Sequence, residues 1–300
     1  MRLVLATRRS MLALAQSRAF ARALEAAVPG LTVDELQVVT SGDTIQDRSL
    51  QEVGGKGLFV KELEEALIDR RADFAVHSIK DVPAEVAPGC ALVCIPPRED
   101  PRDVLVTKTG GGLASLAPGA RVGTSSLRRA VALLEARPDL LIEPVRGNVD
   151  TRLRKVTEGP LDATVLALAG LKRLGLEGRA SEVLSVEVSL PAIGQGALGI
   201  ECREDDGATI DALRTMEDRE TMLTVMAERA VMTAVEGSCK IPVAAYALHR
   251  GDTLWLRAML ADDDGSNVRR GERTIPWPSC PEESEKIGLE LGYQLKGKKA

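Results

Sequence analysis

Short apolar runs alternate with helical segments along most of this 300-residue chain, and this alternation constrains the fold most strongly. The first pair is typical: residues 3–6 suit a buried strand, and residues 11–27 suit a helix that Ser10 can cap. Further strands are expected at residues 33–40, 74–77, 104–107, 120–122, 140–145, 163–167 and 198–202, with helices at 58–69, 126–136 and 151–156 between them. The pattern predicts parallel βαβ units and therefore an α/β fold.

The pattern is interrupted twice, by residues 95–103, which are rich in proline and charge, and by the glycine-rich residues 191–197. From Thr221 onward a helix is followed by alternating apolar residues, which is typical of an antiparallel sheet. We expect two doubly wound α/β lobes around a hinged cleft and a smaller α+β C-terminal domain. Residues 95–103 and 191–197 would be the two crossings, the segments in which the chain passes from one lobe to the other. The expected boundaries are 1–97 with 197–217 for the first domain, 98–196 for the second and 218–300 for the third.

The composition excludes several classes of function. With 44 acidic and 39 basic residues the net charge is −5, and only 2% of residues are aromatic, so neither nucleic acid nor an anionic membrane is an expected partner. The sequence has no apolar run long enough to span a bilayer, and its first residues do not resemble a signal peptide, so we expect a cytoplasmic location. Five scattered cysteines and two histidines predict neither disulfides nor a metal site.

Arginines gather in the second expected lobe. Residues 121–173 contain ten basic and six acidic residues, and the cations Arg128, Arg129, Arg146, Arg152 and Arg173 each follow an expected strand. Because α/β folds bind ligands at the carboxyl ends of their strands, these guanidinium groups predict a site for carboxylates or phosphates.

Two turns have the chemistry of an anion site at a helix N-terminus. One contains Thr124, Ser125 and Ser126 before the Arg128–Arg129 pair, and the other contains Arg8 and Ser10. The alternative is that a serine only caps the helix while the arginines are solvated or paired with acids.

Three further segments allow either a functional or a structural role. Residues 54–59, which include Lys56 and Phe59, lack the spacing of a nucleotide loop and form either a lid or an ordinary loop. Asp81 follows an expected strand, where it either faces a ligand or pairs with Lys80. Cys239 lies in a tight turn beside a lysine that favours the thiolate, although most cysteines of this kind are simply small buried residues.

Taken together and in this order, these segments resemble the porphobilinogen deaminase family. The resemblance extends from residue 3 to about residue 275 and rests on GGKGLF at 54–59, HSIKDVP at 77–83, GTSSLRR at 123–129, RGN at 146–148 with TRL at 151–153, LALAGLKRLG at 166–175 and QG at 195–196.

The resemblance implies a transferase that also goes by the name hydroxymethylbilane synthase. Its lobes would resemble those of periplasmic binding proteins, and a dipyrromethane cofactor would be held by a thioether at Cys239. Four porphobilinogen molecules would be condensed with loss of ammonia, and hydrolysis would release 1-hydroxymethylbilane. The implied partner is the small-molecule substrate porphobilinogen alone, bound by a monomer. The competing hypothesis is a two-lobed anion-binding module without catalysis, which the combination of Asp81 and Cys239 disfavours.

The resemblance also implies residue roles. Asp81 would be catalytic. The cofactor would be held by Cys239, Lys80, Asp81, Thr124, Ser125, Ser126, Arg128, Arg129, Arg146 and Gly170. The substrate would be held by Arg8, Ser10, Lys56, Phe59, Arg128, Arg146, Arg152, Arg173 and Gln195.

Overall fold

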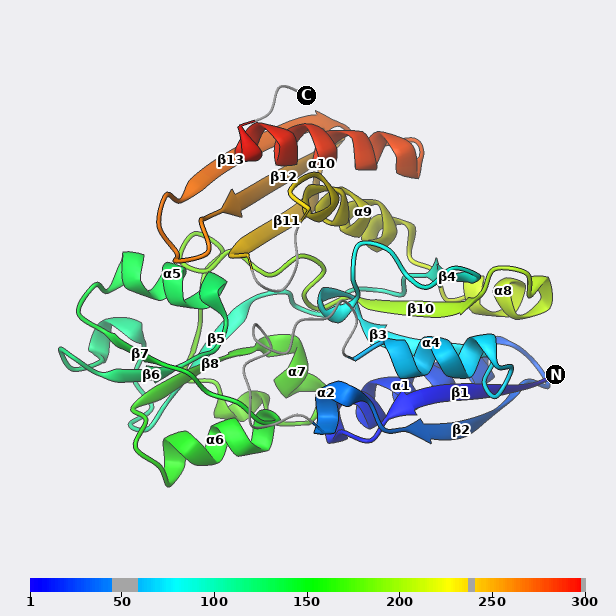
Figure 1. Cartoon of the computed structure of the whole chain (residues 1–300), viewed down its shortest axis with the longest axis horizontal. Coiled ribbons are helices and arrows are strands. Elements are labelled where there is room, and N and C mark those ends of the chain that lie inside the picture. Colours follow the sequence, from blue (N-terminus) through cyan, green and yellow to red (C-terminus); the bar gives the residue numbers. More distant parts are fainter. Residues whose placement is uncertain (45–58, 237–240, 298–300) are drawn as a thin grey trace. The chain divides into compact units, whose positions relative to one another are not determined.

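The computed structural model describes residues 1–44, 59–236 and 241–297. Backbone contacts divide the chain into two compact units, Met1–Arg98 with Ala197–Leu223 and Glu99–Gly196 with Thr224–Ala300. Each unit contains a five-stranded mixed sheet flanked by helices (Figure 1), which confirms the expected α/β class. The predicted three-domain boundaries and the hinged cleft stay predictions.

The sheet of the first unit has the strand order β2-β1-β3-β10-β4. Its strands are β1 (Arg2–Arg8), β2 (Thr32–Val38), β3 (Phe74–Ser78), β4 (Cys90–Cys94) and β10 (Leu198–Arg203). The helices are α1 (Met11–Ala27), α2 (Ser41–Thr44), α4 (Lys61–Ile68) and α8 (Gly207–Arg214), with the 3-10 turn η1 (Ile79–Asp81) after β3. β1 is parallel to β2 and β3, whereas β10 is antiparallel to both of its neighbours.

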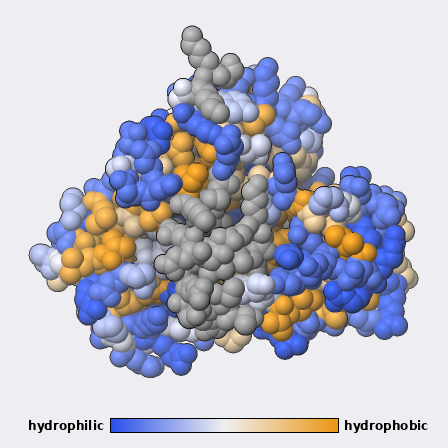
Figure 2. Space-filling view, in the orientation of Figure 1, coloured by the Kyte–Doolittle hydropathy of each residue, from blue (hydrophilic) through white to orange (hydrophobic). Residues whose placement is uncertain are grey.

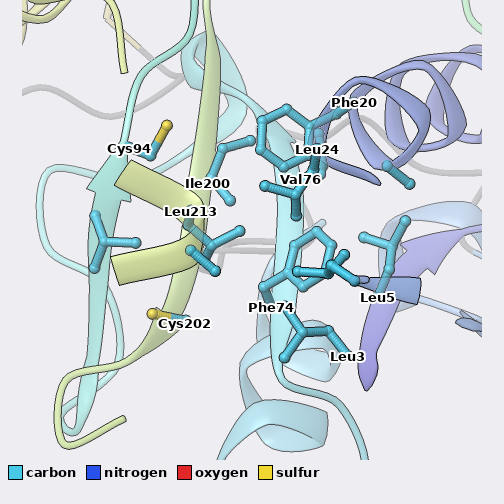
Figure 3. Packing of buried hydrophobic residues seen from close by; sticks show 14 residues of the cluster. Leu3, Leu5, Phe20, Leu24, Phe74, Val76, Cys94, Ile200, Cys202 and Leu213 are labelled. Atoms are coloured by element: carbon cyan, nitrogen blue, oxygen red, sulfur yellow. The ribbon is translucent and has the colours of Figure 1, made fainter. Parts of the chain in front are cut away.

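One core cluster of the first unit lies between the sheet and the helices α1 and α8 (Figure 3). The rings of Phe20 and Phe74 meet edge to face with their centroids 6.0 Å apart, and Leu24 and Ile200 are fully buried beside them. The Ser10 side chain accepts a hydrogen bond from the Ala13 N–H at 3.3 Å, so the expected N-cap of α1 is confirmed.

The sheet of the second unit has the order β7-β6-β8-β5-β9. Its strands are β5 (Asp103–Thr107), β6 (Arg121–Gly123), β7 (Leu141–Glu143), β8 (Ala163–Ala167) and β9 (Glu182–Val183). The helices are α5 (Leu127–Ala136), α6 (Val149–Thr157) and α7 (Leu168–Arg173), with 3-10 turns η2 (Leu113–Ser115) and η3 (Glu177–Arg179).

The two sheets share one topology. In the spatial order given above, the first three strands of each sheet are parallel to one another. The fourth strand across the sheet, β10 or β5, runs antiparallel to them. β5 and β10 each follow directly on one of the expected crossings, residues 95–103 and 191–197. The parallel βαβ pattern predicted from the sequence therefore holds for the other strands but does not extend to β5 and β10, because a chain that enters from the other unit does not first return along a helix.

The rest of the second unit is a three-stranded antiparallel sheet covered by two helices (Figure 1). Its strands are β11 (Val243–Arg250), β12 (Thr253–Leu260) and β13 (Arg269–Pro276). Its helices are α10 (Pro281–Lys296) and α9 (Arg219–Ala234), of which residues 219–223 are counted with the first unit. The fully buried Glu228 of α9 accepts hydrogen bonds from the N–H groups of Gly194 at 2.7 Å and Ala247 at 2.9 Å. This carboxylate therefore connects the helix both to β11 and to the second crossing.

The two crossings contact each other within the second unit. The Glu99 N–H donates to the Gly196 carbonyl at 3.2 Å, and Gly196 has a φ of +92°. A Cβ at Gly196 would lie 2.3 Å from the Glu99 carbonyl oxygen. Glycine is thus required here by both the backbone conformation and the close approach.

Hydrophilic residues predominate on the described surface seen in Figure 2, with hydrophobic residues in scattered areas between them. Within the described residues, no helix is both long and apolar enough to cross a membrane.

Candidate active site

A small pocket of about 60 Å³ in the first unit brings together four of the predicted site residues. Arg8, Ser10, Phe59 and Asp81 all line it. The guanidinium carbon of Arg8 lies 4.2 Å from the centre of the Phe59 ring, a cation–π contact. The pocket therefore offers a cation, a hydroxyl, an aromatic face and a carboxylate at one place.

The strand directions explain why these residues meet. β1 and β3 are parallel neighbours, so both end at the same edge of the sheet. Arg8 is the last residue of β1, and β3 leads into η1, which contains Lys80 and Asp81. The η1 turn is held by hydrogen bonds from Ile79 N–H to the Ala197 carbonyl at 3.1 Å and from Val82 N–H to the Ile79 carbonyl at 3.0 Å. Lys80 and Asp81 are exposed at its end.

Three polar residues that line this pocket are not among the predicted site residues: Gln16, His77 and Ser78. Gln16 of α1 is buried, and its Nε2 donates to Ser78 Oγ at 3.0 Å. A signal existed in the sequence, because Gln16 interrupts the apolar face of the helix, and a polar residue on such a face is retained where it has a hydrogen-bond partner.

The turn before α5 in the second unit forms its own hydrogen bonds. Buried Thr124 accepts from the Ser126 N–H through Oγ1 at 3.1 Å, and exposed Ser125 donates through Oγ to the Val145 carbonyl at 2.8 Å. Ser126 occupies the N-cap position, but its side chain forms no capping hydrogen bond. Neither serine caps the helix through its hydroxyl, so that part of the structural alternative is not what the structure shows.

Arg128 and Arg129 are buried, and both bind the carboxylate of Asp103. Arg128 Nη1 lies 2.8 Å from Asp103 Oδ2, and Arg129 Nη2 lies 2.7 Å from Oδ1. Arg128 Nη1 also donates to the Leu190 carbonyl at 2.6 Å, and Arg129 Nη1 donates to the Val165 carbonyl at 3.0 Å. The arginines are thus paired with an acid, as the structural alternative held, but two guanidinium groups share one carboxylate and one positive charge remains in excess.

Asp103 is the centre of this network. It also accepts hydrogen bonds from Ser189 Oγ at 2.8 Å and from Gln195 Nε2 at 2.9 Å. Burial by itself would raise the pKa of Asp103, but the charges and hydrogen bonds of Arg128 and Arg129 outweigh burial and hold this pKa well below its usual value. Asp103 is not among the site residues predicted from the sequence. Its signal was an acidic residue at the start of an otherwise apolar strand.

The other predicted cations of the second unit follow strands that end at one sheet edge. β6 is parallel to β7 and β8, and Asp103 at the start of antiparallel β5 lies at the same edge, opposite Ala167. Arg146 is half-buried, and Arg152 Nε donates to the Gly147 carbonyl at 2.9 Å.

α7 begins at the end of β8. Gly170 is buried within this helix, and Arg173 donates through Nη2 to the Gly196 carbonyl at 2.7 Å. Burial lowers the pKa of Arg173 to about 10. Fully buried Gln195 donates to the Pro101 carbonyl at 2.6 Å as well as to Asp103. Arg173 and Gln195 therefore both contact a crossing, and their predicted contacts with substrate stay predictions.

Lys56 and Cys239 lie outside the described residues. Three other cysteines, Cys90, Cys94 and Cys202, are buried, and burial raises the pKa of each thiol to about 12. Such thiols are poor nucleophiles at neutral pH. In the described part of the chain, no group of three or more His, Cys, Asp and Glu residues is arranged to hold a metal ion.

A larger cavity, of about 400 Å³, lies between α5 and the three-stranded sheet of the second unit. Arg128 is the one predicted site residue among those that line it, and the other charged residues are already paired within the described structure. Arg270 pairs with Glu135, and Arg257 pairs with Glu272 through Nε at 2.6 Å.

These observations define an α/β protein with two units of like strand order, each with arginine at one edge of its five-stranded sheet. A small antiparallel sheet with two helices completes the described structure. Two family models match this chain: porphobilinogen deaminase, dipyrromethane cofactor binding domain, over residues 3–211, and porphobilinogen deaminase, C-terminal domain, over residues 222–297. The chain belongs to the porphobilinogen deaminase family, which confirms the resemblance seen in the sequence.

A full-length relative agrees with this assignment. A porphobilinogen deaminase of Sorangium cellulosum (strain So ce56) is 72% identical over 294 residues, which cover 98% of each chain. Among solved structures, the VFT2 domain of Bordetella pertussis BvgS has a TM-score of 0.45 and 15% identity, over 72% of this chain and 86% of that domain. The extracellular-binding protein YtmK of Bacillus subtilis has a TM-score of 0.42 and 9% identity, over 71% of this chain and 88% of that one.

Proposed function

We infer that this chain is a hydroxymethylbilane synthase, a transferase that joins four porphobilinogen molecules head to tail. Each condensation releases ammonia, and hydrolysis finally frees the linear tetrapyrrole 1-hydroxymethylbilane. Family membership and the 72% identical relative support this function. The structural observation that carries it is the pocket where Arg8, Ser10, Phe59 and Asp81 meet, because a porphobilinogen needs both cations for its carboxylates and an anion for its ammonium and pyrrole N–H groups.

The residues present fit the dipyrromethane cofactor. Each of its two rings carries an acetate and a propionate, so the group is a polyanion and requires cations. The buried Arg128 and Arg129 share one carboxylate and retain a positive charge, and Arg146, Arg152 and Arg173 follow at the same sheet edge. Cys239 would supply the thioether sulfur, and the bound group would supply a covalent primer that makes each elongation intramolecular.

Asp81 is the residue to which we assign the chemistry. When ammonia leaves a porphobilinogen, positive charge develops on the pyrrole and its N–H, and a carboxylate placed beside that N–H stabilises the charge. After the new C–C bond forms, the pyrrole α-carbon that attacked the electrophilic methylene must lose its proton, and an Asp81 Oδ atom can accept it. Arg8 and Ser10 would meanwhile bind substrate carboxylates, and Phe59 would cover the pocket beside Arg8.

Asp81→Asn tests this assignment. It keeps the size of the side chain but removes its charge, so we expect kcat to fall by about 100-fold or more while the cofactor is still retained. Steady-state assays of porphobilinogen consumption give kcat, and intact mass gives cofactor content. Glu85→Gln, an exposed carboxylate in the loop that follows, is the matched control and should leave kcat unchanged. A kcat for Asp81→Asn within about twofold of the parent would remove Asp81 from the mechanism.

Intact mass tests the covalent cofactor. The purified protein should exceed its sequence mass by one dipyrromethane, and Cys239→Ser should abolish the excess. Cys280→Ser, a change at a half-buried cysteine elsewhere in the chain, should keep it. An unmodified mass in freshly purified, active protein would contradict the proposal.

We also propose that the enzyme acts as a cytoplasmic monomer on a small-molecule substrate without nucleic acid. The net charge of −5 and the scarcity of aromatic residues support the last point. Light scattering coupled to gel filtration should give one chain mass of 32.0 kDa. A stable dimer mass would overturn the monomer.

A further inference from the structure

His77 and Glu201 form a buried pair of titratable groups that the proposed reaction does not use. His77 Nε2 lies 2.8 Å from Glu201 Oε2, and the two side chains are 3% and 0% exposed. In the antiparallel β3–β10 ladder, His77 pairs with Gly199, and Ala75 pairs with Glu201. Both side chains therefore emerge on the same face of the sheet as diagonal neighbours.

The pair lies in apolar surroundings. Ala75, on the same face, packs in a cluster with Leu63 and Leu67 of α4 and with Cys90 of β4. Glu64 of α4 interacts electrostatically with both members of the pair, and its Oε1 accepts a hydrogen bond from the Ala87 N–H at 2.7 Å. Taking a carboxylate and an imidazole out of water is costly, and a buried pair of this kind is seldom more stabilising than apolar side chains of similar volume. Stability alone is therefore a weak reason for this pair.

The position of His77 in the pocket explains the buried pair better than stability does. His77 lines the same pocket as Asp81 and precedes it by four residues. The connecting residues are fastened to β10, because Ser78 pairs with Leu198 and the Ile79 N–H donates to the Ala197 carbonyl. Any displacement of His77 along the strand would thus be passed directly to η1 and to its last residue, Asp81.

We propose that His77 is a positioning residue, which Glu201 fixes from β10 so that Lys80 and Asp81 are held at the edge of the pocket. The proposal rests on the proposed function only for the role of Asp81. The coupling between the buried pair and the η1 turn is a property of the fold and can be measured without substrate.

Glu201→Gln tests the proposal, since it keeps the side-chain volume and replaces the carboxylate that contacts the imidazole with an amide. Hydrogen exchange followed by mass spectrometry should show the amides of Ile79 and Val82 exchanging about tenfold faster or more, because the hydrogen bonds that close η1 are loosened. With porphobilinogen, kcat should fall by about tenfold or more while KM changes by less than about threefold. Intact mass should show that the cofactor is retained.

The matched control is Leu67→Ala, which creates a cavity on the same sheet face without removing either member of the pair. It should lower the stability of the protein yet leave kcat and the exchange of η1 close to those of the parent. The double variant His77→Gln with Glu201→Gln should be about as impaired as either single variant, because both remove one interaction. His77→Gln alone supplies the same measurements if Glu201→Gln does not fold.

The outcomes are distinguishable. Unchanged exchange in η1 would overturn the proposal whatever the activity, since a loss of kcat with an intact turn would mean that His77 acts by another route. A kcat within about twofold of the parent would overturn it as well. If the parent protein itself consumed no porphobilinogen, the proposed function would fail, while the exchange measurement would still decide whether the pair holds the turn.

Discussion

Asp103 accepts hydrogen bonds from four side chains although it is fully buried. Arg128, Arg129, Ser189 and Gln195 are its donors, and they come from α5, the loop before the second crossing and the crossing itself. A buried carboxylate in this position holds two guanidinium groups in fixed orientations, which is what repeated recognition of carboxylates requires. Its charge also limits how much positive charge the site accumulates before a ligand arrives.

Asp103→Asn should therefore be strongly destabilising. It leaves two buried guanidinium groups without a counter-charge, and breaking a buried pair in this way costs about 3–5 kcal/mol. Urea unfolding measures the loss. Asp139→Asn is the control: Asp139 pairs with Arg137 at 2.7 Å but is exposed, so its replacement should change stability little.

The difference in unfolding free energy between the parent protein and Asp103→Asn should depend on pH, and its direction of change is known. The folded pKa of Asp103 lies below its unfolded value, so its contribution to stability is complete above the unfolded value and is lost as pH falls. The stability difference between the parent and Asp103→Asn should shrink below about pH 4, by up to about 1.4 kcal/mol per pH unit. A difference that stays constant from pH 6 to pH 3 would contradict the assigned network.

At the residue level, the sequence predicted the first-unit pocket better than the arginine network. Arg8, Ser10 and Asp81 follow strands that prove to be parallel neighbours, so their meeting follows from local pattern and a general rule of α/β folds. The partner of Arg128 and Arg129 was not predictable in this way. Asp103 contacts them through tertiary packing across 25 and 26 residues, and its place at the start of an apolar strand does not indicate which residues it binds.

Among the elements, α9 and α10 pack unusually closely. A Cβ at Gly288 of α10 would lie 2.1 Å from the Ala227 carbonyl oxygen and 2.6 Å from the Ala230 Cβ. A Cβ at Gly292 would lie 2.5 Å from the Ala234 Cβ. Small residues on both helices thus let the two backbones approach, which fixes α10 against the helix that precedes Cys239 in the chain.

Gly288→Ala should disturb this contact. The added methyl group meets backbone as well as side chain, so we expect a loss of about 1–3 kcal/mol in unfolding free energy despite the higher helix propensity of alanine. Thermal or urea unfolding gives the value. Gly178→Ala, where a Cβ would meet nothing within 4 Å, should be close to neutral. Equal stability of the two variants would show that the helices can separate at no cost.

Helices and strands could be predicted where residues within or next to the element carry the sequence signal. The helix at 11–27 was predicted with the bounds of α1, because an N-cap, an apolar periodicity and a Pro-Gly stop agree. β13 was not predicted, since most of its residues are exposed and several are charged, and only its pairing with β12 makes it a strand. The antiparallel direction of β5 and β10 likewise depends on partners far away in the sequence.

For the whole molecule, loading of the cofactor should change stability. A group attached only to the folded state favours that state, and a polyanion also neutralises the excess charge of the Arg128–Arg129 pair. Cys239→Ser should therefore unfold at a temperature lower by about 4 °C or more. Scanning calorimetry against Cys280→Ser, which keeps the cofactor, measures the effect, and identical melting temperatures would contradict it.

The way in which strands are contributed to the two sheets bears on the order in which the protein can fold during synthesis. The sheet containing β5 to β9 is built from residues 103–183 alone, so all of its strands have been made once residue 183 leaves the ribosome. The first-unit sheet lacks its fourth strand until residue 203, and β4 has no described strand partner other than β10. A nascent chain that ends between residues 183 and 203 would hold one complete sheet and one sheet with an unpaired edge. The sheet of the second unit, although it begins later in the sequence, is therefore the first whose strands can all pair.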